Sequence, residues 1–174
     1  MRMSALYKLK EYKNNSDAIN RKLREGSDSP DLYAIDELFS EIEVPSTLYR
    51  FLDNQYVKFD GEIFCDPAYL SCTDDIDNFI CKVPTNHLAC LIIKLDSPTS
   101  CIYVEELLPE FDGEGEYILP RSLKLQLVND SAKVLKSMDE FDKFLEENNS
   151  YTGSEELRGA RKIETISLYT LIKA

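Results

Sequence analysis

Two glutamates separated by one residue stand where an acidic loop meets an apolar run. The stretch 109–127 reads PEFDGEGEYILPRSLKLQL and contains Glu114 and Glu116. The apolar run alternates as a strand does, and residues two apart on a strand share a face. Two interpretations are open at this point. The pair lies either in a solvated turn that leads into a sheet or in an active site that uses paired carboxylates.

Two further motifs precede the glutamates. Arg50 lies in TLYRFLD, which follows a helical region and has the composition of a strand. A buried strand rarely accepts an arginine unless its side chain meets an anion. Further on, YLSCTDD places Ser71 and Thr73 two apart, so both hydroxyls project from the same face of a strand. Each motif alone is weak, but the ordered set of three is fairly specific.

The ordered motifs resemble those of the mono-ADP-ribosyltransferases of the bacterial exotoxin and bacteriophage type. Further segments of the chain are similar to family segments. They are INRKLREG, the acidic AIDELFSEI and LYR upstream, EGEYILPRSLKLQL downstream, and the closing ISLYTLI. The similarity runs from 16 to 172, and 131–162 is its least matched part. The resemblance implies an enzyme that cleaves the nicotinamide–ribose bond of NAD, its co-substrate, and transfers ADP-ribose to a protein side chain without a metal.

The resemblance also implies separate roles for the two glutamates. Glu116 matches the carboxylate that hydrogen-bonds the ribose and stabilises the positive charge that develops as the bond breaks; the alternative is a surface glutamate. Glu114 matches the position that orients and deprotonates the acceptor, and a glutamate there is similar to members that modify arginine. One more charge in an acidic loop explains Glu114 almost as well. The preceding loop would face the substrate, with Phe111 as a contact and Gly113 as a hinge.

The remaining site residues also have two interpretations each. Arg50 would bind a phosphate of NAD or a nearby backbone group, or else form an ordinary ion pair. Ser71 would hold Glu116 by a hydrogen bond, and Thr73 would support the strand or the ribose. Phe79 would pack on nicotinamide or be a core residue, and the sequence favours the core.

Two departures from the family pattern keep other functions open. Phe51 follows the arginine where the family usually has glycine, and Cys72 stands in the middle of the serine motif. The first departure motivates a second hypothesis, a non-catalytic interaction module with the same fold. A third hypothesis retains the enzyme and changes the acceptor to RNA or a small molecule.

The elements that position these motifs predict an α+β fold in one domain over 1–174. Residues 4–44 are expected to form two helices, with Ser16 as an N-cap, Gly26 as a stop and Pro45 after the second helix. Six short strand-like segments follow from Thr47. We expect a helical cap over 1–45, a two-sheet mixed β core over 46–174, a helical insertion near 131–149, a polar loop over 150–162 and a last strand.

Composition narrows the class of partner. The chain has 32 acids against 20 bases and a net charge of -12, which disfavours nucleic acid and favours basic partners. Five scattered cysteines without a CxxC pair and one histidine give no metal pattern and fit reduced thiols. No signal-peptide core or membrane-length apolar run is visible. These features predict a protein that acts in a cytoplasm, its own or that of a host after delivery. The family resemblance implies a toxin-like effector, which we expect to be a monomer.

Overall fold

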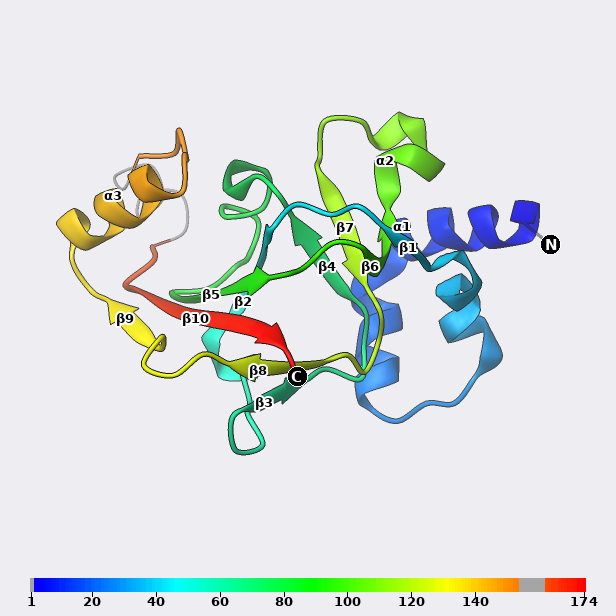
Figure 1. The fold of residues 1–174 in the computed structure, drawn as a ribbon, viewed down its shortest axis with the longest axis horizontal. Helices are drawn as coiled ribbons and strands as arrows, with labels where there is room; N and C mark the ends of the chain where they lie inside the picture. The colour runs from blue at the N-terminus through cyan, green and yellow to red at the C-terminus, as the bar shows by residue number, and fades with distance from the viewer. Residues whose placement is uncertain (1, 154–161) are drawn as a thin grey trace.

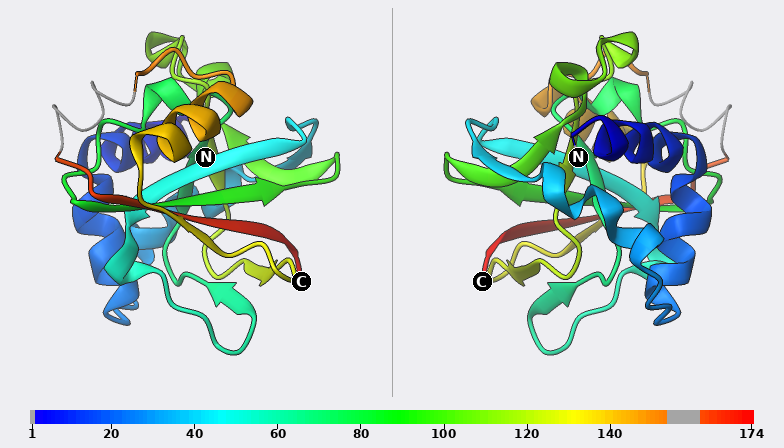
Figure 2. Two further views of the ribbon diagram at one scale, coloured as in Figure 1. Left: turned by 90° about the vertical axis from the view of Figure 1, so that its left-hand side faces the viewer. Right: turned by 90° about the vertical axis from the view of Figure 1, so that its right-hand side faces the viewer.

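The computed structural model describes residues 2–153 and 162–174, and it has the predicted α+β class. Helix α1 (Arg2–Arg24) and helix α3 (Met138–Glu147) lie at opposite ends of the long axis, and the strands lie between them (Figure 1). Seen from the two ends, each helix lies in front of the strands (Figure 2). Residues 154–161 of the predicted polar loop are outside the described part. No helix in the described part is long and apolar enough to cross a membrane.

The described strands form one hydrogen-bonded path. Their bounds are β1 Ser40–Ile42, β2 Thr47–Asp53, β3 Ile63–Cys65, β4 Leu70–Thr73, β5 His87–Lys94, β6 Thr99–Tyr103, β7 Glu116–Leu119, β8 Lys124–Leu127, β9 Lys133–Leu135 and β10 Thr165–Lys173. The spatial order is β1-β6-β7-β4-β2-β5-β10-β8-β3, and β9 pairs with β10. β5 and β10 are parallel, whereas β2 is antiparallel to β5, so the sheet is mixed, as predicted.

The path has a narrow junction between β2 and β4. These two strands are paired only at Tyr49 and Thr73, whereas β2 pairs with β5 along its whole length. The junction divides the strands into two parts, β1-β6-β7-β4 and β2-β5-β10-β8-β3. The expected two sheets are therefore two parts of one path. Arg50 lies on one side of the junction, and Ser71 and Glu116 lie on the other.

An apolar stripe attaches α1 to the first part of the sheet. Ala5, Leu9 and Tyr12 recur at the spacing of one helix face and are almost fully buried. Leu9 and Tyr12 belong to a core cluster that includes Ile102 of β6 and Ile118 of β7. The burial of this face fixes the position of α1 against the strands that carry the glutamates.

Helix α3 covers the second part of the sheet in the same way. A capping box between Ser137 and Glu140 satisfies backbone groups at its start. Phe141, Phe144 and Leu145 then project from one face into a cluster with residues of β2, β5 and β10. The predicted helical insertion is thus shorter than 131–149, because Lys133–Leu135 form strand β9 against β10.

Two other element predictions were wrong at their ends. The second N-terminal helix is a 3-10 helix, η1 (Pro30–Leu38). Residues Ser40–Ile42 form the edge strand β1, which pairs with β6. One of the six strand-like segments predicted after Thr47 is CIYVEEL, residues 101–107. Its strand ends at Tyr103, and Val104–Leu107 form helix α2. In the first case pairing with a distant strand outweighed the helical spacing of the sequence.

The first helix begins earlier than its predicted cap. α1 starts at Arg2, and the predicted start at Ser16 coincides with a kink at Asn15, whose φ of -132° is not helical. Gly26, with a φ of +83°, lies just past the helix end in the conformation that favours glycine. The stop at Gly26 was therefore predicted correctly, and the helical region predicted from residue 4 begins at Arg2. The predicted cap at Ser16 follows the kink within this helix.

Candidate active site

Glu116 begins β7 and is only 4% exposed. Its carboxylate accepts hydrogen bonds from the Ser71 hydroxyl of β4 and from the Lys13 ammonium of α1. The antiparallel register of β4 and β7 pairs Thr73 with Glu116 and brings Ser71 to the same face. A buried carboxylate is costly unless such partners compensate its charge. The strand register therefore brings Ser71 within hydrogen-bonding distance of Glu116, which is the contact that the family resemblance implied.

Glu114 lies two residues earlier, in the loop before β7. Its side chain is 34% exposed, and its Oε2 atom lies 2.9 Å from Lys13 Nζ. The backbone oxygen of Glu114 accepts from the Asn78 side chain, and Thr73 Oγ1 is 3.3 Å from the same oxygen. The two glutamates thus converge on one cation. Glu116 is the buried member of the pair, and Glu114 is the partly exposed one.

Lys13 completes a cluster that the motifs did not reveal. Its side chain is 12% exposed, and the ammonium also lies 4.8 Å from the centre of the Phe111 ring. Burial lowers the pKa of Lys13, but its hydrogen bonds and charge attraction to Glu116 and Glu114 outweigh this effect and raise the pKa overall. The signal for Lys13 was its place four residues after Leu9, at the edge of the buried face of α1.

Arg50 projects from β2 with part of its donor capacity unused. Its Nη1 atom donates to the backbone oxygen of Ser71 at 3.3 Å, and its buried Nε atom has no hydrogen-bond partner among the described residues. Burial raises the pKa of the nearby Tyr12 hydroxyl. The charge of Arg50 lowers this pKa, and the charge of Glu116 raises it. Arg50 and Glu116 thus act on the same neighbour. An unpartnered guanidinium nitrogen fits an anionic or carbonyl group of a ligand such as NAD.

Thr73 supports the backbone around the glutamates. It is fully buried, and its hydroxyl lies 3.0 Å from the backbone oxygen of Asp75 and 3.3 Å from that of Glu114. Of its two expected roles, the contacts favour support of the strand over contact with the ribose. Asn78 holds the same Glu114 oxygen and was not anticipated, because a single asparagine in a loop gives no motif.

Helix α2 fixes the other side of the glutamate loop. The Glu105 carboxylate accepts hydrogen bonds from the backbone N–H of Gly115 and from the Tyr103 hydroxyl, and these bonds lower its pKa. Gly115 has a φ of +58°, and a Cβ there would collide with the Asp74 carboxylate. Both the backbone conformation and the nearby Asp74 side chain therefore favour glycine between the two glutamates.

Phe79, Phe51 and Cys72 all take part in packing. Phe79 packs against the core cluster that contains Phe51, and Lys82 lies 4.9 Å from the centre of its ring. Phe51 is 3% exposed, and alternation along β2 points it away from the Arg50 face. Cys72 is fully buried in a neighbouring cluster, and burial raises the pKa of its thiol.

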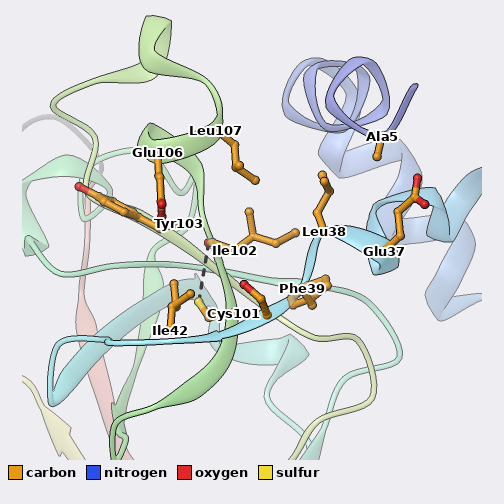
Figure 3. A pocket seen from close by; sticks show the side chains of 11 residues that line it. Ala5, Glu37, Leu38, Phe39, Ile42, Cys101, Ile102, Tyr103, Glu106 and Leu107 are labelled. Carbon is orange, nitrogen blue, oxygen red and sulfur yellow. Dashed lines mark hydrogen bonds between the residues drawn. The ribbon is translucent and has the colours of Figure 1, made fainter. Parts of the chain in front are cut away.

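A hollow of about 390 Å³ lies between η1, β1, β6 and α2 (Figure 3). Apolar side chains such as Phe39, Ile102 and Leu107 line it, together with the carboxylates of Glu37 and Glu106. No residue of the three motifs lines this hollow, so it is separate from the glutamate site. Among residues 2–153 and 162–174, no group of three or more His, Cys, Asp or Glu residues is arranged to hold a metal ion.

No family model and no curated protein matches the chain. Three similar solved structures are Plx2a, an ADP-ribosyltransferase toxin from Paenibacillus larvae, the SpvB domain of Salmonella, and exoenzyme S from Pseudomonas aeruginosa. Plx2a is 17% identical with a TM-score of 0.59, and the match covers 98% of this chain and 86% of Plx2a. SpvB is 16% identical with a TM-score of 0.58, and the match covers 97% of this chain and 98% of the SpvB domain. Exoenzyme S is 13% identical with a TM-score of 0.59, and the match covers 98% of this chain and 73% of exoenzyme S. The chain therefore has the ADP-ribosyltransferase fold.

Proposed function

We propose that the protein is an NAD-dependent mono-ADP-ribosyltransferase that modifies an arginine side chain of a target protein and releases nicotinamide. The observation that carries this proposal is the buried Glu116, held by Ser71 and preceded by the partly exposed Glu114, on a sheet of this fold. The similar structure of exoenzyme S was determined in a complex bound to Carba-NAD, which supports NAD as the co-substrate.

Arg50, Ser71 and Glu116 are the residues proposed to act on NAD. NAD supplies the nicotinamide–ribose bond that breaks, and positive charge develops on the ribose as it does so. The Glu116 carboxylate stabilises that charge, and Ser71 keeps the carboxylate in one orientation. The unpartnered Nε atom of Arg50 binds an oxygen of the co-substrate.

Glu114 is proposed to bind the acceptor. A guanidinium is planar and charged at ordinary pH, so a carboxylate can hold it and accept a proton as attack proceeds. Glu114 is partly exposed and already contacts a cation at 2.9 Å, which supports a role in cation recognition. Its loop position leaves it accessible to a side chain of another protein.

Two alternatives receive less support. The interaction-module hypothesis depended on Phe51, but the ring of Phe51 lies in the core rather than over the Arg50 face. An RNA acceptor is disfavoured by the net charge of -12. The monomeric state and the cytoplasmic location, in the protein's own cell or in a host cell after delivery, remain predictions.

Transfer from labelled NAD to host proteins tests the proposal. Glu116→Gln should lose nicotinamide release and transfer by about 100-fold or more, because the stabilising charge is gone. Glu114→Gln should lose transfer and retain nicotinamide release. Glu106→Gln, which removes an exposed carboxylate of α2, is the control and should match the wild type. An active Glu116→Gln would refute the enzyme assignment, and equal loss of both reactions in Glu114→Gln would refute the division of roles.

A further inference from the structure

Lys13 meets every group that the proposed reaction places beside a cationic acceptor. Its ammonium contacts the carboxylates of Glu114 and Glu116 and faces the ring of Phe111. Glu114 and Phe111 are the two side chains expected to contact the substrate. The free protein therefore holds a cation of its own where a target arginine would bind.

A comparison with Lys10 shows that this contact is unusual for the helix. Lys10 lies one turn earlier on α1 and pairs with Glu110 at 3.0 Å, where the two side chains are 53% and 47% exposed. Such a surface pair contributes little. Lys13 is 12% exposed and contacts a carboxylate that is 5% exposed, so its charge is largely removed from water. Two carboxylates and an aromatic face form a cation-binding cage rather than a solvated ion pair.

The cage suits a guanidinium better than it suits an ammonium. An ammonium is a compact point charge, whereas a guanidinium offers a planar fork of donors and a face that stacks on aromatic rings. A bidentate contact to a carboxylate and stacking on Phe111 are both available to an arginine side chain. A target arginine could therefore compete with Lys13 for the same groups.

Lys13 can leave the cage without movement of α1. Leu9 and Tyr12 are 0% and 2% exposed and anchor the helix in the core. The lysine side chain has a flexible four-carbon stem, so a change of rotamer moves the ammonium away. Glu114 is partly exposed, so an incoming cation can reach the cage from solvent.

We propose that Lys13 is a specificity-determining residue that occupies the acceptor subsite as an internal cation and must be displaced by the guanidinium of the target. This inference rests on the proposed acceptor role of Glu114. An internal ligand that fills the subsite for about nine-tenths of the time weakens the apparent affinity of an external one by about tenfold. Weakly cationic acceptors are thereby excluded, and an acceptor with further contacts to the protein is favoured.

Agmatine, a small guanidinium compound, provides a test that needs no catalysis. Its dissociation constant is measured without NAD by thermal shift and calorimetry for the wild type, Lys13→Gln, Lys13→Met and Lys13→Arg. Glutamine removes the charge and still donates a hydrogen bond to Glu116, so the fold remains testable if the methionine variant is unstable. Lys10→Gln is the matched control, because it removes the same charge from the same face of α1.

Lys13→Gln should bind agmatine about tenfold more tightly than the wild type. Lys13→Arg and Lys10→Gln should remain close to the wild-type value. Equal affinities in Lys13→Gln and Lys10→Gln would overturn the proposal, and so would loss of agmatine binding in Lys13→Gln.

Nicotinamide release from NAD without an acceptor, measured on the same samples, separates this inference from the proposed function. Tighter agmatine binding in a protein that never releases nicotinamide would support the cation subsite and refute the enzyme. Nicotinamide release with unchanged agmatine binding would support the enzyme and refute the role of Lys13.

Discussion

Tyr12 connects helix α1 to the charged residues of the site. Its side chain is 2% exposed, Asn20 Nδ2 donates to its hydroxyl at 3.0 Å, and its ring packs edge-to-face on Tyr69. Burial raises its pKa to about 12. The folded protein therefore retains a proton at a pH where the unfolded chain has lost it.

This shift predicts a loss of stability at alkaline pH. Below pH 10 Tyr12 is neutral in both states; between pH 10 and about 12 only the unfolded chain releases the proton, so unfolding becomes more favourable. The free energy of unfolding should fall by about 1.4 kcal/mol per pH unit from this residue alone. Denaturant unfolding between pH 9 and pH 11 should show a steeper fall for the wild type than for Tyr12→Phe. Parallel curves would show that the Tyr12 proton is not linked to folding.

The site residues differ in how far the sequence could predict them. Period-two spacing placed Glu114 and Glu116 on one face of their strand, but only the family resemblance implied that Ser71 of another strand contacts Glu116. Lys13 is 101 residues from Glu114 and 103 residues from Glu116 in the chain. Its place at the edge of the buried face of α1 indicates that it lies near the core, but its contact with the glutamates depends on how α1 packs. Glu105 was missed for a related reason, since it acts through the backbone of Gly115.

At the scale of elements, α2 supports the loop that carries Glu114, called the acceptor loop after the proposed role of that residue. It joins β6 to the loop, and its Glu105 holds the backbone N–H of Gly115. Glu116 is fixed independently by the register of β7 with β4 and by Ser71. Loss of the α2 contact should therefore disturb Glu114 more than Glu116.

Glu105→Ala should separate transfer from NAD cleavage. Removing a charged hydrogen-bond acceptor from the loop costs about 1.5–3 kcal/mol, and a misplaced Glu114 should lower kcat/KM for agmatine by about tenfold or more. Nicotinamide release without an acceptor should change much less. Glu106→Ala, on the same turn, is the control. If both reactions fall equally in Glu105→Ala, α2 supports the whole site rather than the acceptor loop.

Two of the element errors share a physical origin. The segments 40–42 and 133–135 have helical neighbours in sequence, yet each pairs with a strand that is distant in the chain. Strand formation depends on such partners more than helix formation does. The long strands β2, β5 and β10 were predicted because their apolar residues leave few alternatives, whereas three-residue strands such as β1 and β9 carry too little pattern.

At the scale of the molecule, charge should govern the encounter with a target. The net charge of -12 attracts basic proteins over a distance set by the ionic strength. The Debye length falls from about 30 Å at 0.01 M to about 10 Å at 0.1 M salt. A small neutral or weakly charged acceptor is affected far less by this field.

Salt should therefore lower transfer to a basic protein selectively. Between about 0.01 M and about 0.1 M salt, kcat/KM for an arginine-rich basic protein should fall by about tenfold. Nicotinamide release without an acceptor should change much less over the same range. An acidic protein with exposed arginines serves as the comparison and should become a better acceptor as salt increases. A salt response that is the same for both proteins would mean that the overall field does not select the target.

The junction between β2 and β4 has a mechanical consequence. Arg50 belongs to one part of the sheet and Ser71 and Glu116 to the other, and the strands are paired there only at Tyr49 and Thr73. A ligand that binds Arg50 and Glu116 together would connect the two parts of the sheet at the junction where the fewest residues are paired. We expect the relative motion of the two parts of the sheet to decrease when such a ligand is bound, because the ligand adds a connection between them.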